Sequence, residues 1–150
     1  MKKYFDDFQV GQKERVGSVL VTKEDIVQFA QEFDPQPFHV DEAAAKMSIF
    51  GGLTACGAHI VALKIKLIHA QAQGKAEILA GLGWDEWRFA TPVRPNDTLT
   101  LEIETVEKRE SQSKPDRGIV RQQLSVLNQT NETGELSDID NEENWKEFGW

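Results

Sequence analysis

The spacing of apolar side chains changes along the chain and predicts which segments are helices and which are strands. Between residues 26 and 33 the spacing is that of an amphipathic helix, on Ile26, Phe29, Ala30 and Phe33. Thr22 is a suitable N-cap, and the acids that follow it favour the positive end of a helix dipole. Pro35 ends this helix, because proline has no amide hydrogen to donate and clashes with the preceding turn.

Two further helices are expected. A short, alanine-rich helix runs from Glu42 to Ser48, with Asp41 as its N-cap. After the Gly51-Gly52 break, Thr54 caps a long run from Ala55 to Ala72 that is apolar on nearly every side. A helix of that kind is buried, and at ~1.5 Å per residue this one is roughly 27 Å long.

Everything after the long helix has the pattern of β-strands. Apolar and polar positions alternate most clearly from Thr98 to Glu107, with the first face formed by Leu99, Leu101, Ile103 and Thr105. Strands are also expected at Val16–Val21, Ile78–Arg88 and Ile119–Leu127, and residues 114–118 carry a hairpin-turn signal. A buried helix surrounded by strands predicts an α+β fold, in which an antiparallel sheet wraps around a long central helix.

The last segment departs from this pattern. Leu136 and Ile139 are three residues apart with acids around them, so the two-residue period of a strand is lost. Either a last strand is absent or the segment packs in an unusual way, and the sequence leaves both alternatives open. We therefore divide the chain into a single domain at 1–134 and an acidic, atypical C-terminal tail at 135–150.

Composition and charge narrow the class of protein. With 39% hydrophobic and 28% charged residues, the chain is typical of a soluble domain. The segment 135–150 contributes −5 of the net charge of −8. The sequence has no basic stripe of the kind that binds nucleic acid, so nucleic acid is not expected as a partner. The single cysteine, Cys56, excludes an internal disulfide. No signal peptide is apparent and the most apolar run contains Lys64 and Lys66, so we expect a cytoplasmic protein without a membrane span.

The strongest chemical signal is the segment Asp34-Pro35-Gln36-Pro37-Phe38-His39. Each proline restricts the residue before it to extended geometry, so we expect a short rigid loop that holds Asp34, Gln36 and His39. An acid and an imidazole on such a loop, next to a helix N-terminus, are the parts of an acid–base site. Taken singly, Asp34 is more often a solvated acid and His39 a capping or core histidine, but their combination favours the functional interpretation.

Three segments together resemble one family. The hexapeptide is similar to the D-x-N-P-x-H signature of MaoC-like dehydratases and R-specific enoyl-CoA hydratases, which are hot-dog proteins. The downstream FGGLTACGAH resembles the approach to that fold's central helix, and residues 89–99 resemble its PVxPGDTL stretch. The resemblance extends from Phe5 to Gly134 and implies a single hot-dog domain that adds water to, or removes it from, an acyl-thioester.

The resemblance also implies roles for individual residues. Asp34 and His39 would share the proton transfers, Gln36 would orient water or a carboxylate, and the Gly57 N–H would stabilise the developing oxyanion. Further substrate contacts are expected from Phe38, Phe50, Gly51, Gly52, His59 and Arg94. No cofactor is expected. No metal site is expected either, since Cys56-x-x-His59 has no second pair.

The expected ligand is the thioester of coenzyme A or of acyl-carrier protein, and the expected assembly is a homodimer or a dimer of dimers. Two other functions fit the same residues. One is thioester hydrolysis, because a single fold hosts several chemistries. The other is a non-catalytic acyl-CoA-binding or regulatory module, for which the Gln36 replacement and the acidic tail are the motivation. The sequence does not specify the acyl chain.

Overall fold

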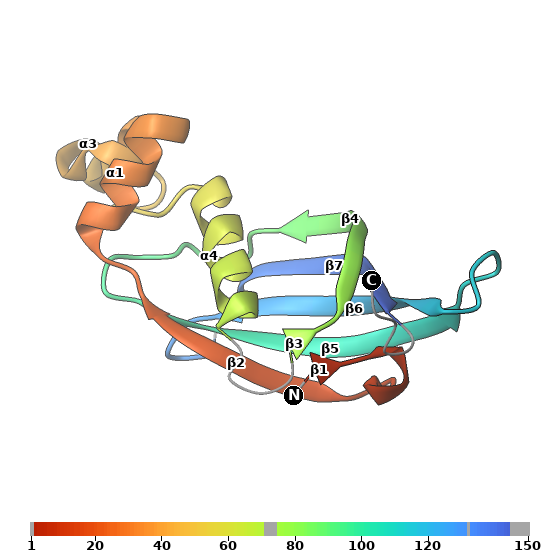
Figure 1. The fold of residues 1–150 in the computed structure, drawn as a ribbon. Helices are drawn as coiled ribbons and strands as arrows, with labels where there is room; N and C mark the ends of the chain where they lie inside the picture. The colour runs from red at the N-terminus through yellow and green to blue at the C-terminus, as the bar shows by residue number, and fades with distance from the viewer. Residues whose placement is uncertain (1, 71–74, 132, 145–150) are drawn as a thin grey trace.

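Helix α4 (Gly57–His69) lies across one face of a five-stranded antiparallel sheet (Figure 1). The structure is a computed structural model, and it describes residues 2–70, 75–131 and 133–144. The strands, in their order across the sheet, are β2 (Lys13–Leu20), β5 (Thr98–Glu110), β6 (Arg117–Leu127), β7 (Thr133–Asn144) and β4 (Ile78–Arg88). The predicted α+β class, with its antiparallel sheet and central helix, is confirmed, and the arrangement is a hot-dog fold.

Shorter elements complete the domain. Helices α1 (Lys23–Phe33) and α3 (Glu42–Met47) stand together beside α4 in Figure 1, and the one-turn helix α2 (Pro37–Val40) connects them. Near the N-terminus, β1 (Lys2–Lys3) pairs in parallel with β3 (Lys75–Ala76), and a 3₁₀ turn, η1, follows (Phe5–Asp7). Within the described residues, no helix is both long and apolar enough to cross a membrane.

Two of the three predicted helix caps, Thr22 and Asp41, are confirmed. The Thr22 hydroxyl accepts a hydrogen bond from the Asp25 amide at 3.1 Å, and the Asp41 carboxylate accepts one from the Ala44 amide at 3.0 Å. Each bond satisfies an amide that has no partner inside its helix, which stabilises a helix by roughly 1 kcal/mol. These caps define where α1 and α3 begin, and so where the connection between them lies.

The core lies between the sheet and α4. The predicted alternation along β5 is confirmed, because Leu99, Leu101 and Ile103 are all buried and face α4 together with side chains of β6. From the helix, Ile60 and Leu67 pack into the same cluster. Burying one such side chain contributes about 1.5–3 kcal/mol, so this layer accounts for much of the force that holds α4 on the sheet.

The start of the central helix differs from the prediction. The helix begins at Gly57 rather than Ala55, and its N-cap is Cys56 rather than the predicted Thr54. The reason is that the preceding amides pair elsewhere: the Thr54 amide donates to the Phe38 carbonyl at 3.3 Å and the Ala55 amide to the Val93 carbonyl at 2.9 Å. The helix also ends earlier than predicted, at His69 with Ala70 as its C-cap, so the prediction that it continues to Ala72 is wrong.

The face of α4 toward β4 contains a charged residue. Lys64 is fully buried, and its ammonium lies 4.0 Å from the centre of the Trp84 ring and 5.2 Å from that of Trp87. Ile65, by contrast, is 41% exposed. The sequence predicts a helix that is apolar on nearly every side and therefore buried; the helix is central to the fold, but the exposure of Ile65 shows that one side is not buried.

The acidic segment contributes a strand. β7 runs from Thr133 to Asn144 and pairs antiparallel with β6 on one side and β4 on the other. Of the two alternatives for this segment, the absence of a last strand does not hold. The strand crosses the proposed division at 134/135, and that division stays a prediction; residues 145–150 lie outside the described residues.

Candidate active site

Asp34 and His39 are brought together by a sharp change of direction between α1 and α2. Asp34 is the C-cap of α1, and its carbonyl accepts a hydrogen bond from the Gln36 amide at 2.8 Å. Pro37 then occupies the first helical position of α2, where a missing amide hydrogen costs nothing. The result places His39 Nε2 3.7 Å from Asp34 Oδ2.

The local structure differs from the expected loop in one respect. His39 belongs to the one-turn helix α2, for which Gln36 is the N-cap residue, and its amide donates to the Gln36 carbonyl at 2.9 Å. Four residues are too short for an apolar period to reveal a helix, so only the Gln36-Pro37 step signalled it. The expectation that neither Asp34 nor Gln36 lies inside a helix is correct.

The orientation of the His39 ring is fixed by one backbone group. Its Nδ1 lies 2.6 Å from the Thr54 carbonyl oxygen, and the ring is buried. A carbonyl only accepts, so Nδ1 carries the hydrogen of this bond. When the ring is neutral, Nε2 is therefore an unprotonated acceptor that faces Asp34, which suits a group that exchanges a proton at that atom.

A cavity of about 370 Å³ opens beside His39. Its walls are mostly apolar, and three phenyl rings contribute to them, from Phe38, Phe50 and Phe89. Phe38 and Phe50 pack against each other with ring centres 5.1 Å apart. The remaining lining comes from Thr54, Ala55, Gly57, Ile60, Ala90, Thr91 and Pro92. A mainly apolar cavity with few polar groups is typical of a small-molecule site.

Gly57 lies in the wall of this cavity as the first residue of α4. The amides of a helix's first turn have no acceptor within the helix and carry the positive end of its dipole. The sequence places Gly57 in the first turn, and the structure confirms that position. A side chain at Gly57 would meet the Phe89 ring, whose Cζ would lie 2.9 Å from the added Cβ.

Six of the expected site residues are not among those that line this cavity: Asp34, Gln36, Gly51, Gly52, His59 and Arg94. Asp34 is linked to the cavity through its contact with His39. The Gln36 side chain is exposed, and only its backbone takes part in the turn. Arg94 instead donates to the carbonyls of Phe50, Gly52 (2.9 Å) and Leu53 (3.3 Å). Its guanidinium therefore holds the 50–53 segment in place, and this segment contributes Phe50 to the cavity wall.

The glycines of this segment have different environments. Gly51 has φ +66°, a conformation that favours glycine, and a side chain there would meet nothing. Gly52 lies against the Arg94 guanidinium instead. Neither glycine is among the residues that line the cavity.

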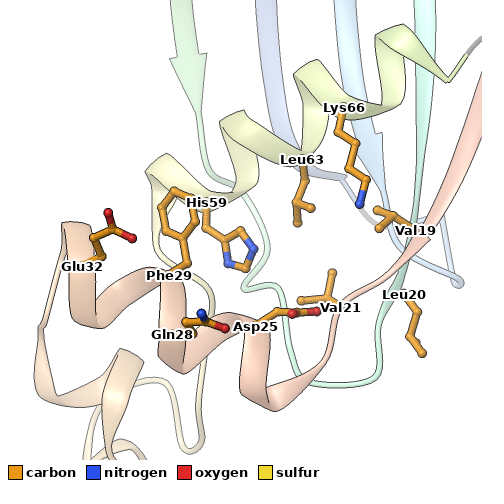
Figure 2. A pocket seen from close by; sticks show the side chains of 10 residues that line it. All are labelled: Val19, Leu20, Val21, Asp25, Gln28, Phe29, Glu32, His59, Leu63 and Lys66. Carbon is orange, nitrogen blue, oxygen red and sulfur yellow. The ribbon is translucent and has the colours of Figure 1, made fainter.

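His59 lies on a different face of α4 and lines a second cavity, of about 350 Å³ (Figure 2). The ring stacks on Phe29, with ring centres 4.5 Å apart, and Nδ1 is buried with no hydrogen-bond partner among the described residues. Burial lowers the pKa of His59, and the charge of Asp25 opposes this only in part. The two cavities share no lining residue among those described, so His59 and His39 line different cavities.

Cys56 is buried beside the site. Burial raises the pKa of its thiol, so the thiolate is disfavoured. The prediction that Cys56 is a small buried residue rather than a nucleophile is confirmed in its burial. Among the described residues, no three histidine, cysteine or acidic side chains are grouped so that they could hold a metal ion.

Two contributors to the site were not singled out from the sequence. The Thr54 carbonyl orients His39, but a backbone carbonyl is the same in every residue and leaves no signal. Phe89 stands at the start of the segment that resembles PVxPGDTL, so its place after β4 could have marked it as a wall residue.

Comparison with known proteins decides the family. The model of the MaoC like domain matches residues 7–127. The chain belongs to the MaoC-like domain family. A relative in Bacillus subtilis (strain 168), the uncharacterized protein YdeM, is 36% identical over 124 residues, which cover 83% of this chain and 86% of the relative.

Solved structures agree with this family. The MaoC-like dehydratase from Rhodospirillum rubrum has a TM-score of 0.89 and 37% identity, and the match covers 97% of this chain and 99% of that one. The R-hydratase PhaJ1 from Pseudomonas aeruginosa has a TM-score of 0.74 and 27% identity, over 95% of this chain and 86% of that one. The hot-dog MaoC-like assignment made from the sequence segments is therefore confirmed.

Proposed function

We propose that the protein is an acyl-thioester hydratase or dehydratase, which adds water to, or removes it from, an enoyl-thioester. The observation that carries this proposal is the Asp34–His39 pair at 3.7 Å beside a mostly apolar cavity with the N-terminus of α4 in its wall. An enoyl-thioester needs these three features: an acid–base pair, an apolar site for the acyl group and a donor for its carbonyl. The R-hydratase name of one structural relative supports the same chemistry.

In the hydration direction, a water molecule held between Asp34 and His39 gives up a proton as its oxygen bonds to the β-carbon. The electron pair of the double bond moves toward the α-carbon and the thioester carbonyl, and a proton then reaches the α-carbon. Asp34 and His39 share these two proton transfers. His39 acts through Nε2, because its Nδ1 is hydrogen-bonded to the Thr54 carbonyl. No net oxidation occurs, and dehydration is the reverse sequence.

The negative charge that develops on the thioester oxygen requires a donor. The Gly57 N–H takes this role in our proposal, since it is at the first position of α4 with the dipole of the helix behind it. In other enzymes, removing a preorganised donor of this kind slows the reaction by roughly 10²–10³-fold. Gln36 contributes through its backbone, which fixes the turn between the two catalytic side chains.

The ligand and the assembly are part of the same proposal. The acyl carrier is coenzyme A or acyl-carrier protein, and the protein is a homodimer or a dimer of dimers. Support for self-association comes from β4, which is an edge strand with exposed Ile78, Leu82 and Trp87. An exposed apolar edge favours pairing with another chain.

The direct test follows the absorbance of the enoyl-thioester band of crotonyl-CoA with purified protein. We expect the wild-type protein to remove this absorbance and His39→Ala to slow the reaction by about 10²–10⁴-fold, the contribution of a positioned acid–base group. His69→Ala is the matched control, because His69 is exposed at the far end of α4. Equal rates for His39→Ala and the wild type would overturn the proposed role of His39.

A further inference from the structure

We propose that Phe89 is a specificity-determining residue that excludes acyl groups branched at the carbon next to the thioester carbonyl. This inference rests on the proposed function, because it takes Gly57 as the point where the carbonyl oxygen binds. It concerns the shape of the acyl group, which neither the family nor the acid–base pair determines.

The first observation is the position of the Phe89 ring over Gly57. A Cβ built on Gly57 would lie 2.9, 3.1 and 3.4 Å from Cζ, Cε2 and Cε1 of Phe89, and these are the three nearest atoms. In a helix the Cα–Cβ bond tilts toward the N-terminus, as do the free N–H groups of the first turn. The outer edge of the phenyl ring therefore stands beside the approach to the Gly57 N–H.

The second observation is the arrangement of the cavity walls. Phe38 and Phe50 pack together and come from α2 and the 50–53 segment, whereas Phe89 enters from the residues after β4. The 50–53 segment is held by Arg94, so the Phe50 backbone cannot easily withdraw. Aromatic rings from two separate parts of the chain thus bound the space beside Gly57.

The consequence concerns the carbon next to the carbonyl. A thioester whose oxygen reaches the Gly57 N–H brings its carbonyl carbon against the ring edge, and the next carbon of the acyl chain is one bond away. A planar, unbranched acyl group fits beside the ring, whereas a methyl branch at that carbon collides with it. One methyl group in a close-fitting apolar site is typically worth about 10–200-fold in discrimination.

The test compares the binding of two saturated esters, butyryl-CoA and isobutyryl-CoA, by calorimetry. Neither has a double bond to hydrate, so binding is measured without turnover. We expect the wild-type protein to bind butyryl-CoA at least about tenfold more tightly. In Phe89→Ala the preference falls to about threefold or less, mainly because isobutyryl-CoA binds more tightly. Phe89→Leu keeps an apolar side chain without the ring edge and gives an intermediate preference.

Phe50→Ala is the matched control. It removes a phenyl ring from the same cavity but not the ring that meets Gly57, so it weakens both esters and leaves their ratio unchanged. A thermal unfolding transition for each variant confirms that it is folded, and Phe89→Leu serves if Phe89→Ala is not.

Equal affinities in the wild type, or an unchanged ratio in both Phe89 variants, would overturn the role of Phe89. A failure of the proposed function looks different: the binding preference and its loss in Phe89→Ala would be present, but crotonyl-CoA would not be hydrated. A protein that binds neither ester would overturn both.

Discussion

His39 and His59 are both expected at the site from the sequence, but their hydrogen-bond partners give the two side chains different properties. Both rings are buried, but His39 has a carbonyl partner for Nδ1 and a carboxylate near Nε2. Nδ1 of His59 has no hydrogen-bond partner in the part of the chain that the structure describes, and the ring stacks on Phe29 instead. An unpaired buried nitrogen disfavours the charged ring, so His59 acts as an apolar packing residue near neutral pH.

This difference predicts how stability depends on pH. The pKa of His59 is lowered in the folded protein, so below the ordinary value near 6.5 the unfolded chain binds a proton that the folded protein does not. Stability attributable to His59 is therefore full above that pH and is lost as the pH falls toward the folded pKa. We expect His59→Phe to lose less free energy of unfolding than the wild type between about pH 7.5 and pH 5, as measured by urea unfolding.

The charged groups that line the cavity with His59 are Asp25, Glu32 and Lys66 (Figure 2). They are the same in the wild type and in His59→Phe, so the difference between the two pH profiles reports on the imidazole alone. His69→Phe, at an exposed position, is the control and keeps the wild-type dependence. Parallel pH profiles for the wild type and His59→Phe would contradict this explanation.

At the scale of elements, Arg94 connects two segments that together build the cavity. Its guanidinium binds three carbonyls of residues 50–53, and its own amide donates to Asp97 at 2.8 Å. The planar guanidinium has several donors in a fixed arrangement, which the single ammonium of lysine cannot reproduce. The link between the 50–53 segment and the residues after β4 therefore depends on arginine.

We expect Arg94→Lys to lower the free energy of unfolding by about 1–3 kcal/mol, because carbonyls are left without their partner. Hydration of crotonyl-CoA should fall as well, since the Phe50 wall moves. Urea unfolding and the absorbance assay measure the two effects. Arg88→Lys is the matched control, with an expected change within ~0.5 kcal/mol, because Arg88 pairs with Glu86 on the exposed surface. Equal effects of the two substitutions would contradict the role of Arg94.

Elements with a strong local signal could be predicted from the sequence. The period of α1 and its Thr22 cap, the alternation of β5, and the Asp34–His39 segment each depend on nearby side chains. The start of α4 could not be predicted, because it depends on the pairing of the Thr54 and Ala55 amides with distant carbonyls.

Other features were beyond the sequence for a similar reason. β7 forms although its side chains lack a two-residue period, since its backbone pairs on both sides. The contacts of Arg94 are with carbonyls, which the sequence does not distinguish. The side of α4 on which His59 lies depends on how the helix is rotated against the sheet, and an apolar run does not specify that.

At the scale of the whole molecule, the two edges of the sheet differ. β2 has charged residues at Lys13, Glu14 and Arg15 and an irregularity between Val16 and Val19, devices that protect an edge from pairing. The other edge, β4, exposes Leu82 and Trp87 among other large apolar side chains. Self-association is therefore expected through β4 and not through β2.

We expect sedimentation at micromolar concentration to give at least twice the chain mass of 16.9 kDa. Leu82→Lys places a charge in the apolar edge and should shift the protein toward the monomer. Val10→Lys, at an exposed position outside the strands, should not. A wild-type protein that sediments as a monomer would contradict the assembly.

The central claim is that water adds to the acyl chain and the thioester stays intact. The measurement that tests it most directly is mass analysis of the product formed from crotonyl-CoA in water enriched in heavy oxygen. Our account predicts an intact hydroxyacyl-CoA with one heavy oxygen on the β-carbon, formed by the wild-type protein and lost in Asp34→Asn. Free coenzyme A with the heavy oxygen in a released carboxylate would show thioester hydrolysis instead and contradict the account.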